Sequence, residues 1–250
     1  MAGVAPGQYA QLPAGEGEIV KSSMMTATAE IRRGFVQKVY GIVAAQLVLT
    51  MAIARPISML GNKFLVEYPW VPVASFAVLL STLCVMMCCR ETMRTFPKNY
   101  MFLGVFTAAE SVFIGLACGQ YNAHVILGAL AITAAMFLML TAYAFTTKTD
   151  MTSFGPYLFM ALSAVCCVGF AVAVMQMMGL YVPLLQTFYC LCGVILFSFY
   201  VIYDTQLMLG SYGGHALEFS IDDYVFAAIN LYVDILNLFV NILQLLGDRN

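Results

Sequence analysis

Seven long apolar stretches dominate this sequence and restrict what the chain can fold into. A helix needs about 20 apolar residues to cross the hydrocarbon core of a bilayer. The stretches span residues 35–54, 70–89, 100–118, 125–145, 157–178, 184–209 and 223–246. Because lipid offers no partner to backbone N–H and C=O groups, such segments are expected to be helical. We therefore expect an all-α membrane protein, built as a seven-transmembrane helical bundle.

Composition supports a membrane protein and argues against other classes. Only 10% of the residues are charged, whereas a soluble domain averages about 25%. The net charge of −2 indicates no nucleic-acid partner. Residues 1–33 contain glycine, proline and alanine but no apolar core, so we expect a disordered cytosolic tail. Residues 34–250 are then the seven-helix transmembrane domain.

The basic residues predict how the bundle is oriented. Loops that stay in the cytosol carry an excess of lysine and arginine. One side would hold Lys21, Arg32, Arg33, Lys38, Arg90, Arg94, Lys98 and Lys148, against Arg55, Lys63 and Arg249 on the other. Eight against three places the N-terminus in the cytosol. The C-terminus lies on the opposite side after seven crossings, or in the cytosol if the polar last segment is re-entrant.

Three carboxylates, Glu110, Asp204 and Asp234, lie inside these apolar stretches. An ionisable side chain at that depth costs at least ~2.5 kcal/mol, so it is expected to face other polar groups, water or an ion. Counting 1.5 Å per helical residue, the three lie about 9 to 16 Å from the cytosolic ends of their helices. They could therefore share one layer, where we expect the functional site.

The last apolar segment also carries a polar stripe. Its members are Asp223, Asn230, Asp234, Asn237, Asn241 and Gln244. Spacings of three, four and seven residues place them within an arc of roughly 80° on one helix face. The asparagines either join helices by hydrogen bonds or, together with Glu110 and Asp223, line an ion pathway. Both interpretations remain open at this point.

Asp204 and Asp234 have no lysine or arginine in the middle of any span to neutralise them. Two such carboxyl groups can share one proton, and they then titrate as a coupled pair. That behaviour predicts a pH-sensitive latch between two helices. Carboxylate and amide oxygens suit hard cations, Ca²⁺ above all, bound weakly enough to pass through. We expect no cofactor and no stable metal site, with Ca²⁺ as the permeant ion.

Two C-terminal motifs resemble a known family. The segments 198–206 (SFYVIYDTQ) and 222–239 (DDYVFAAINLYVDILNLF) closely resemble the signature of the Bax inhibitor motif family, and 31–40 resembles its Lifeguard/Golgi anti-apoptotic branch. The resemblance implies a seven-helix bundle with the C-terminal helix central. It further implies residence in the Golgi or endoplasmic reticulum, suppression of apoptosis, and a pH-dependent Ca²⁺ leak that lowers store content.

The resemblance also assigns roles to single residues. Asp204 and Asp234 correspond to the family's pH-sensing pair, and Arg90 is the nearest candidate for an arginine that latches it. Arg90 is equally explained as a basic residue that holds the end of its helix at the cytosolic surface of the membrane. The lipid bilayer, Ca²⁺, and cell-death regulators or calcium-release channels are the implied partners. The glycine-rich loop 211–219 is longer than in the branch, which leaves gating from the cytosolic side open.

Two other functions compete with a leak channel. An intramembrane aspartyl protease would use Asp204 and Asp234 as a catalytic dyad, but the sequence lacks a Gly-x-Gly before Asp234 and a following Pro-Ala-Leu. A non-conducting scaffold would regulate cell death through helix contacts, and its carboxylates would serve only the fold. We expect a protein that is not an enzyme.

Overall fold

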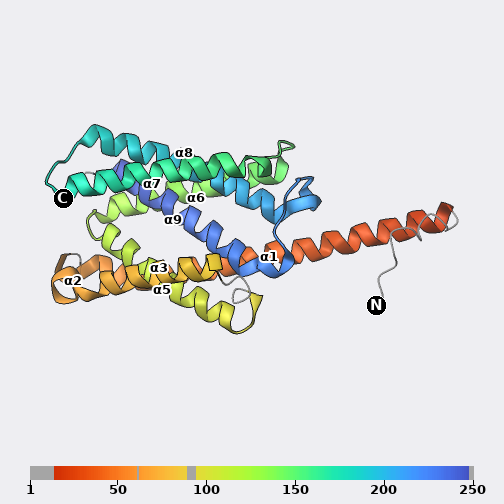
Figure 1. Cartoon of the computed structure of the whole chain (residues 1–250), viewed down its shortest axis with the longest axis horizontal. Coiled ribbons are helices and arrows are strands. Elements are labelled where there is room, and N and C mark those ends of the chain that lie inside the picture. The colour runs from red at the N-terminus through yellow and green to blue at the C-terminus, as the bar shows by residue number, and fades with distance from the viewer. Residues whose placement is uncertain (1–13, 61, 89–93, 248–250) are drawn as a thin grey trace.

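The computed structural model describes residues 14–60, 62–88 and 94–247. Within these ranges every regular element is a helix, and the elements follow one another in a bundle (Figure 1). They are α1 (Ala14–Leu60), α2 (Asn62–Glu67), α3 (Trp70–Cys88), α5 (Lys98–Cys118), α6 (Ala123–Thr146), η2 (Thr152–Phe154), α7 (Gly155–Met177), α8 (Pro183–Leu209), η3 (Gly210–Gly213), η4 (Ile221–Asp223) and α9 (Tyr224–Leu246).

Six helices in the described part of the chain are long and apolar enough to cross a membrane. Each of the seven predicted segments coincides with a helix, and the all-helical membrane class is confirmed. The segment predicted at 70–89 is α3, whose apolar stretch Trp70–Thr82 is shorter than the others. The last segment is one uninterrupted helix, α9, of 23 residues. At 1.5 Å per residue, α9 is about 35 Å long.

The N-terminal segment differs from its prediction as a disordered tail. Helix α1 begins at Ala14 and runs without a break through residue 33 into the first span, so its N-terminal part projects from the bundle (Figure 1). The physical reason is that residues 18–33 contain neither glycine nor proline, so nothing interrupts a helix nucleated in the following span. Residues 1–13 lie outside the described part.

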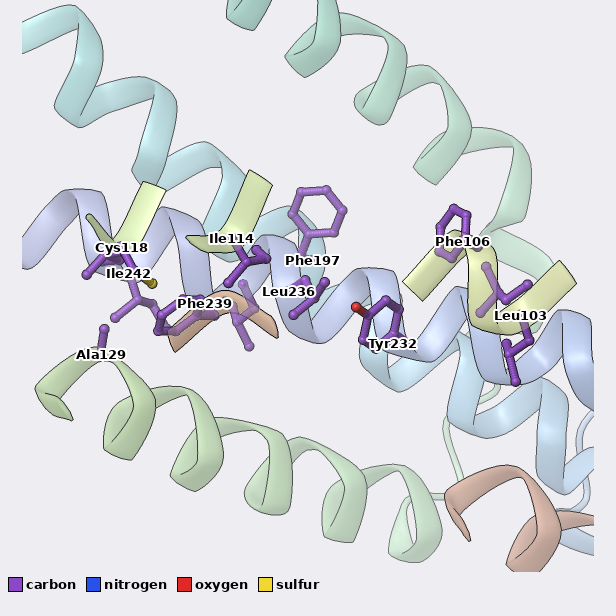
Figure 2. Packing of buried hydrophobic residues seen from close by; sticks show 14 of the residues in the cluster. Leu103, Phe106, Ile114, Cys118, Ala129, Phe197, Tyr232, Leu236, Phe239 and Ile242 are labelled. Carbon is purple, nitrogen blue, oxygen red and sulfur yellow. The ribbon is translucent and has the colours of Figure 1, made fainter. Parts of the chain in front are cut away.

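Helix α9 packs against four other helices: α1, α5, α6 and α8. In its most apolar 18-residue window 72% of the residues are buried, against 11% in α6 and in α7. Tyr232 of α9 is fully buried, and its ring meets that of Phe106 of α5 edge-on, with ring centres 6.4 Å apart. Both side chains lie in the same part of the core in Figure 2. The candidate carboxylates therefore lie on or beside the most enclosed helix.

Candidate functional site

Asp204 of α8 and Asp234 of α9 meet inside the bundle. Their exposed fractions are only 4% and 5%, and the two carboxyl groups lie near each other. Asp234 Oδ2 is buried and accepts no hydrogen bond from the described residues. Two neighbouring carboxyl groups can share a hydrogen bond only while the pair retains a proton. The structure thus brings together the two residues that the sequence analysis paired.

The asparagines of the polar stripe on α9 differ in how deeply they are buried. Asn241 is buried, and its side-chain oxygen lies where a Cβ on Gly193 of α8 would be. Asn230 and Asn237 lie only partly buried on the flank of α9. Asn237 and Asn241 each donate from Nδ2 to a backbone carbonyl four residues earlier, over 2.8 Å. Each amide therefore uses one of its two N–H donors within α9, which leaves the second N–H and the amide oxygen for other partners.

Glu110 of α5 lies on a different flank of α9 from Asp234. It lines a pocket of about 200 Å³ between α5 and α9, together with Asn237 and six apolar side chains. Residues 233, 236, 237 and 240 of α9 face this pocket. At about 100° per residue, Asp234 points roughly a third of a turn away from the centre of that group. Glu110 and the aspartate pair are therefore neighbours around α9 rather than one cluster.

A hydrogen-bonded group beside Glu110 was missed by the sequence analysis. The Tyr232 hydroxyl is 2.7 Å from Thr50 Oγ1, and Gln46 Nε2 donates to Thr107 Oγ1 over 2.9 Å. These contacts join α1, α5 and α9 inside the core. Gln46 and Thr50 are four residues apart and so share one face of α1. This spacing of two polar residues was the one sequence feature that could have predicted a polar contact made by α1 inside the core.

The loop from Gly210 to Asp223 folds back over the end of α8 that carries Asp204. Arg32, which is 5% exposed, donates to the carbonyl oxygens of Leu207 (2.8 Å) and Phe219 (2.7 Å). Gly210 has φ +54°, and a Cβ there would collide with Glu218 and Arg32. The chain reversal after α8 therefore requires glycine at this position. We call Arg32, Asp150, Gln206, His215 and Glu218, with residues 210–219, the loop cap.

The connection between α6 and α7, residues 147–154, also holds the loop cap in place. Asp150 accepts hydrogen bonds from the backbone N–H and hydroxyl of Thr152 and from the backbone N–H of Ala216. His215 Nδ1 lies 3.6 Å from Asp150 Oδ1. Gln206, which is fully buried, donates to the Thr149 carbonyl and accepts from the Met151 N–H.

Both carboxylates of the loop cap are stabilised as anions. Partial burial acts to raise the pKa of Asp150, but the hydrogen bonds from Thr152 and Ala216 and the nearby His215 outweigh it, and the pKa is lowered. The backbone hydrogen bond from Ser211 is the main cause of the lowered pKa of Glu218, with Arg32 adding to it. The loop cap is therefore assembled with both groups charged.

The other predicted site residues have different surroundings. Asp223 precedes α9 and forms a two-pronged ion pair with Arg94, at 2.7 and 2.9 Å, so it lies at the end of the bundle rather than within it. Lys38 Nζ lies 3.2 Å from the centre of the Tyr224 ring in the same region. Arg90, the predicted latch, lies outside the described residues.

Comparison with known proteins places these residues in a family. The model of the family described as "Inhibitor of apoptosis-promoting Bax1" matches residues 32–250. The chain belongs to this family. It is 34% identical to Protein lifeguard 3 of Homo sapiens over 227 residues, covering 88% of this chain and 70% of that protein. It is 33% identical to Protein LIFEGUARD 4 of Arabidopsis thaliana over 235 residues, covering 88% and 87%. The Lifeguard resemblance is confirmed, and the matched region begins at Arg32, so it includes the whole loop cap.

Proposed function

We propose that this protein is a pH-sensitive, Ca²⁺-permeable leak channel of Golgi or endoplasmic reticulum membranes that lowers store calcium and suppresses apoptosis. The observation that carries the proposal is the pair of neighbouring, buried carboxyl groups of Asp204 and Asp234. With one proton the pair joins α8 to α9. Once that proton is lost, two negative charges repel each other in a poorly solvated position. The packing of α8 on α9 is then a natural place for a proton-controlled gate.

The proposed topology has seven crossings, with α3 as the second and α9 as the central helix. Support for a central α9 comes from its burial and its four helix neighbours. Support for a cytosolic N-terminus comes from Arg32, Lys38 and Arg94, which all contact the segment 207–224 at one end of the bundle. Positive charge gathered at one end is the pattern of a cytosolic face.

The proposed ion pathway follows the acceptor oxygens along α9. Asn241, Asn237 and Asn230 provide amide oxygens, Glu110 contributes a carboxylate from α5, and Asp223 stands at the cytosolic mouth. Ca²⁺ takes roughly 6–8 oxygen ligands in loose geometry. Each position on this path offers fewer protein oxygens than that. Water would supply the rest, which fits transient passage better than stable binding.

A catalytic dyad is the less favoured explanation of the aspartate pair, and we propose that the protein is not an enzyme. A protease must admit an extended peptide to its two carboxyl groups, and here each residue is about 95% covered by the folded chain. The anti-apoptotic role rests on the family description and on the Lifeguard relatives. Contacts with cell-death regulators or calcium-release channels are a further route to that role.

Calcium flux from liposomes tests the leak. Purified protein reconstituted with a Ca²⁺ indicator should release trapped Ca²⁺ at a rate that depends on pH, while empty liposomes should not. A scaffold would co-purify with partners and give no flux at any pH, which would exclude the leak. Cleavage of helical transmembrane substrates that is blocked by transition-state analogues of aspartyl proteases would favour the dyad instead.

A further inference from the structure

The pocket between α5 and α9 has the composition of a binding site. Its walls are Phe113, Ile114, Ala117, Val233, Leu236 and Val240, and its two polar residues are Glu110 and Asn237. Ile114 and Leu236, which are buried, lie in the same part of the core in Figure 2. The other six lining residues are only partly buried, so the pocket opens at the flank of the bundle. This flank lies between helices that we place in the membrane.

The two polar residues offer three acceptor oxygens and one N–H donor. Asn237 donates one of its two Nδ2 hydrogens to the Val233 carbonyl, which leaves Oδ1 and the second N–H. Glu110 is only partly buried and lines the pocket, so its carboxylate is available to an occupant. None of the residues that line the pocket in the described chain carries a positive charge. Three acceptor oxygens in an apolar wall are costly to leave unpaired, so an occupant with donors is favoured.

The volume of the pocket and the chemistry of its lining residues limit which kinds of molecule it can bind. A volume of about 200 Å³ corresponds to roughly seven water molecules at ~30 Å³ each. That is too small for a whole lipid but sufficient for a polar head and several methylene groups. A bare metal ion would find only three oxygens, and the described residues contain no group of three metal-binding side chains. A primary ammonium has three N–H donors, which matches the three acceptors.

We propose that this pocket binds the ammonium head of a single-chain amphiphilic amine that enters from the bilayer. The head donates to the carboxylate of Glu110 and to Oδ1 of Asn237. The first methylene groups lie against Phe113 and Val240, and the remaining chain extends into the lipid. The site shares Glu110 and Asn237 with the proposed ion pathway, but amine binding neither uses the aspartate pair nor requires a passing ion.

Photocrosslinking of the full chain in phosphatidylcholine vesicles tests the site. The probe is a dodecyl primary amine with a diazirine near its amine end, and labelled residues are located by mass spectrometry. We expect label on α5 and α9 at Phe113, Ala117 or Val240, displaced by unlabelled dodecylamine. Because charge-assisted hydrogen bonds are lost, Glu110→Gln and Asn237→Leu should each reduce labelling, the first by about tenfold or more.

Matched controls separate this site from non-specific partitioning into lipid. Glu67→Gln removes an exposed carboxylate on α2 and should leave labelling unchanged. A dodecanol probe with the same diazirine should label wild type no more than it labels Glu110→Gln. Equal labelling by the alcohol and the amine, or undiminished labelling of both pocket variants, would overturn the proposal. No calcium is present in this assay, so failure of the leak would not affect its result.

Discussion

Arg32 Nη2 donates a hydrogen bond to the Leu207 carbonyl oxygen over 2.8 Å. This contact ties the first span to the last turn of the helix that carries Asp204. The same guanidinium reaches the Phe219 carbonyl, so one side chain holds both the helix end and the returning loop. Access to the aspartate pair from this end therefore depends on a contact made by the first helix.

Arg32→Ala should release the loop cap. It removes two hydrogen bonds from a charged donor, each worth about 1.5–3 kcal/mol, and leaves the buried Leu207 carbonyl and the partly buried Phe219 carbonyl without that partner. Backbone amides in residues 210–219 should exchange with deuterium markedly faster, and the proposed leak should rise. Arg33→Ala is the matched control, because Arg33 is exposed. Unchanged exchange in Arg32→Ala would show that the loop is held by other contacts alone.

Gly193→Ala should disturb the α8–α9 contact next to the proposed pathway. A Cβ at Gly193 would overlap the Asn241 side chain, so one helix must shift or Asn241 must change rotamer. Overpacking of this kind costs about 1–3 kcal/mol, and thermal unfolding in detergent should show the loss. Gly104→Ala in α5 meets nothing within 4 Å and should be neutral or slightly stabilising. Equal stability of the two variants would contradict the packing described for Asn241.

Asp150 and Glu218 should not contribute to a pH response between pH 5 and 8. Each has a pKa that is lowered in the folded protein. Their stabilisation is therefore fully present above the ordinary carboxyl pKa of about 4 and is lost only as the pH falls through the lowered value. Asp150→Asn should weaken the loop cap throughout the range from pH 5 to 8, yet leave the pH midpoint of flux where it is in wild type. A shifted midpoint in this variant would show that the loop cap, rather than the aspartate pair, senses pH.

The positions of the helices could be predicted because hydrophobicity is a local property of the chain. The predicted segments at 184–209 and 223–246 differ from α8 and α9 by one residue at one end. The N-terminal extension of α1 was missed because a polar segment can be helical without being apolar. The contact of Asp204 with Asp234 was predictable, since two uncompensated carboxyl groups in adjacent helices have few other partners.

The loop cap could not be predicted in the same way. Arg32 is 175 and 187 residues away in sequence from the carbonyl groups that it binds, and no local pattern marks a partner at such a distance. Counting charges assigned Arg32 to the cytosolic side but gave it no other role. Gln206 looked like part of a family motif, whereas its side chain holds the connection before α7.

Calcium release from proteoliposomes between pH 5 and pH 8 tests the account most directly. Wild type would be compared with Asp204→Asn and Asp234→Asn, and with His215→Gln to probe the loop cap. We predict that wild-type flux changes with pH, that each aspartate substitution flattens or shifts the profile, and that His215→Gln keeps the wild-type profile. Flux with the wild-type pH profile in both aspartate variants would contradict a gate at this pair.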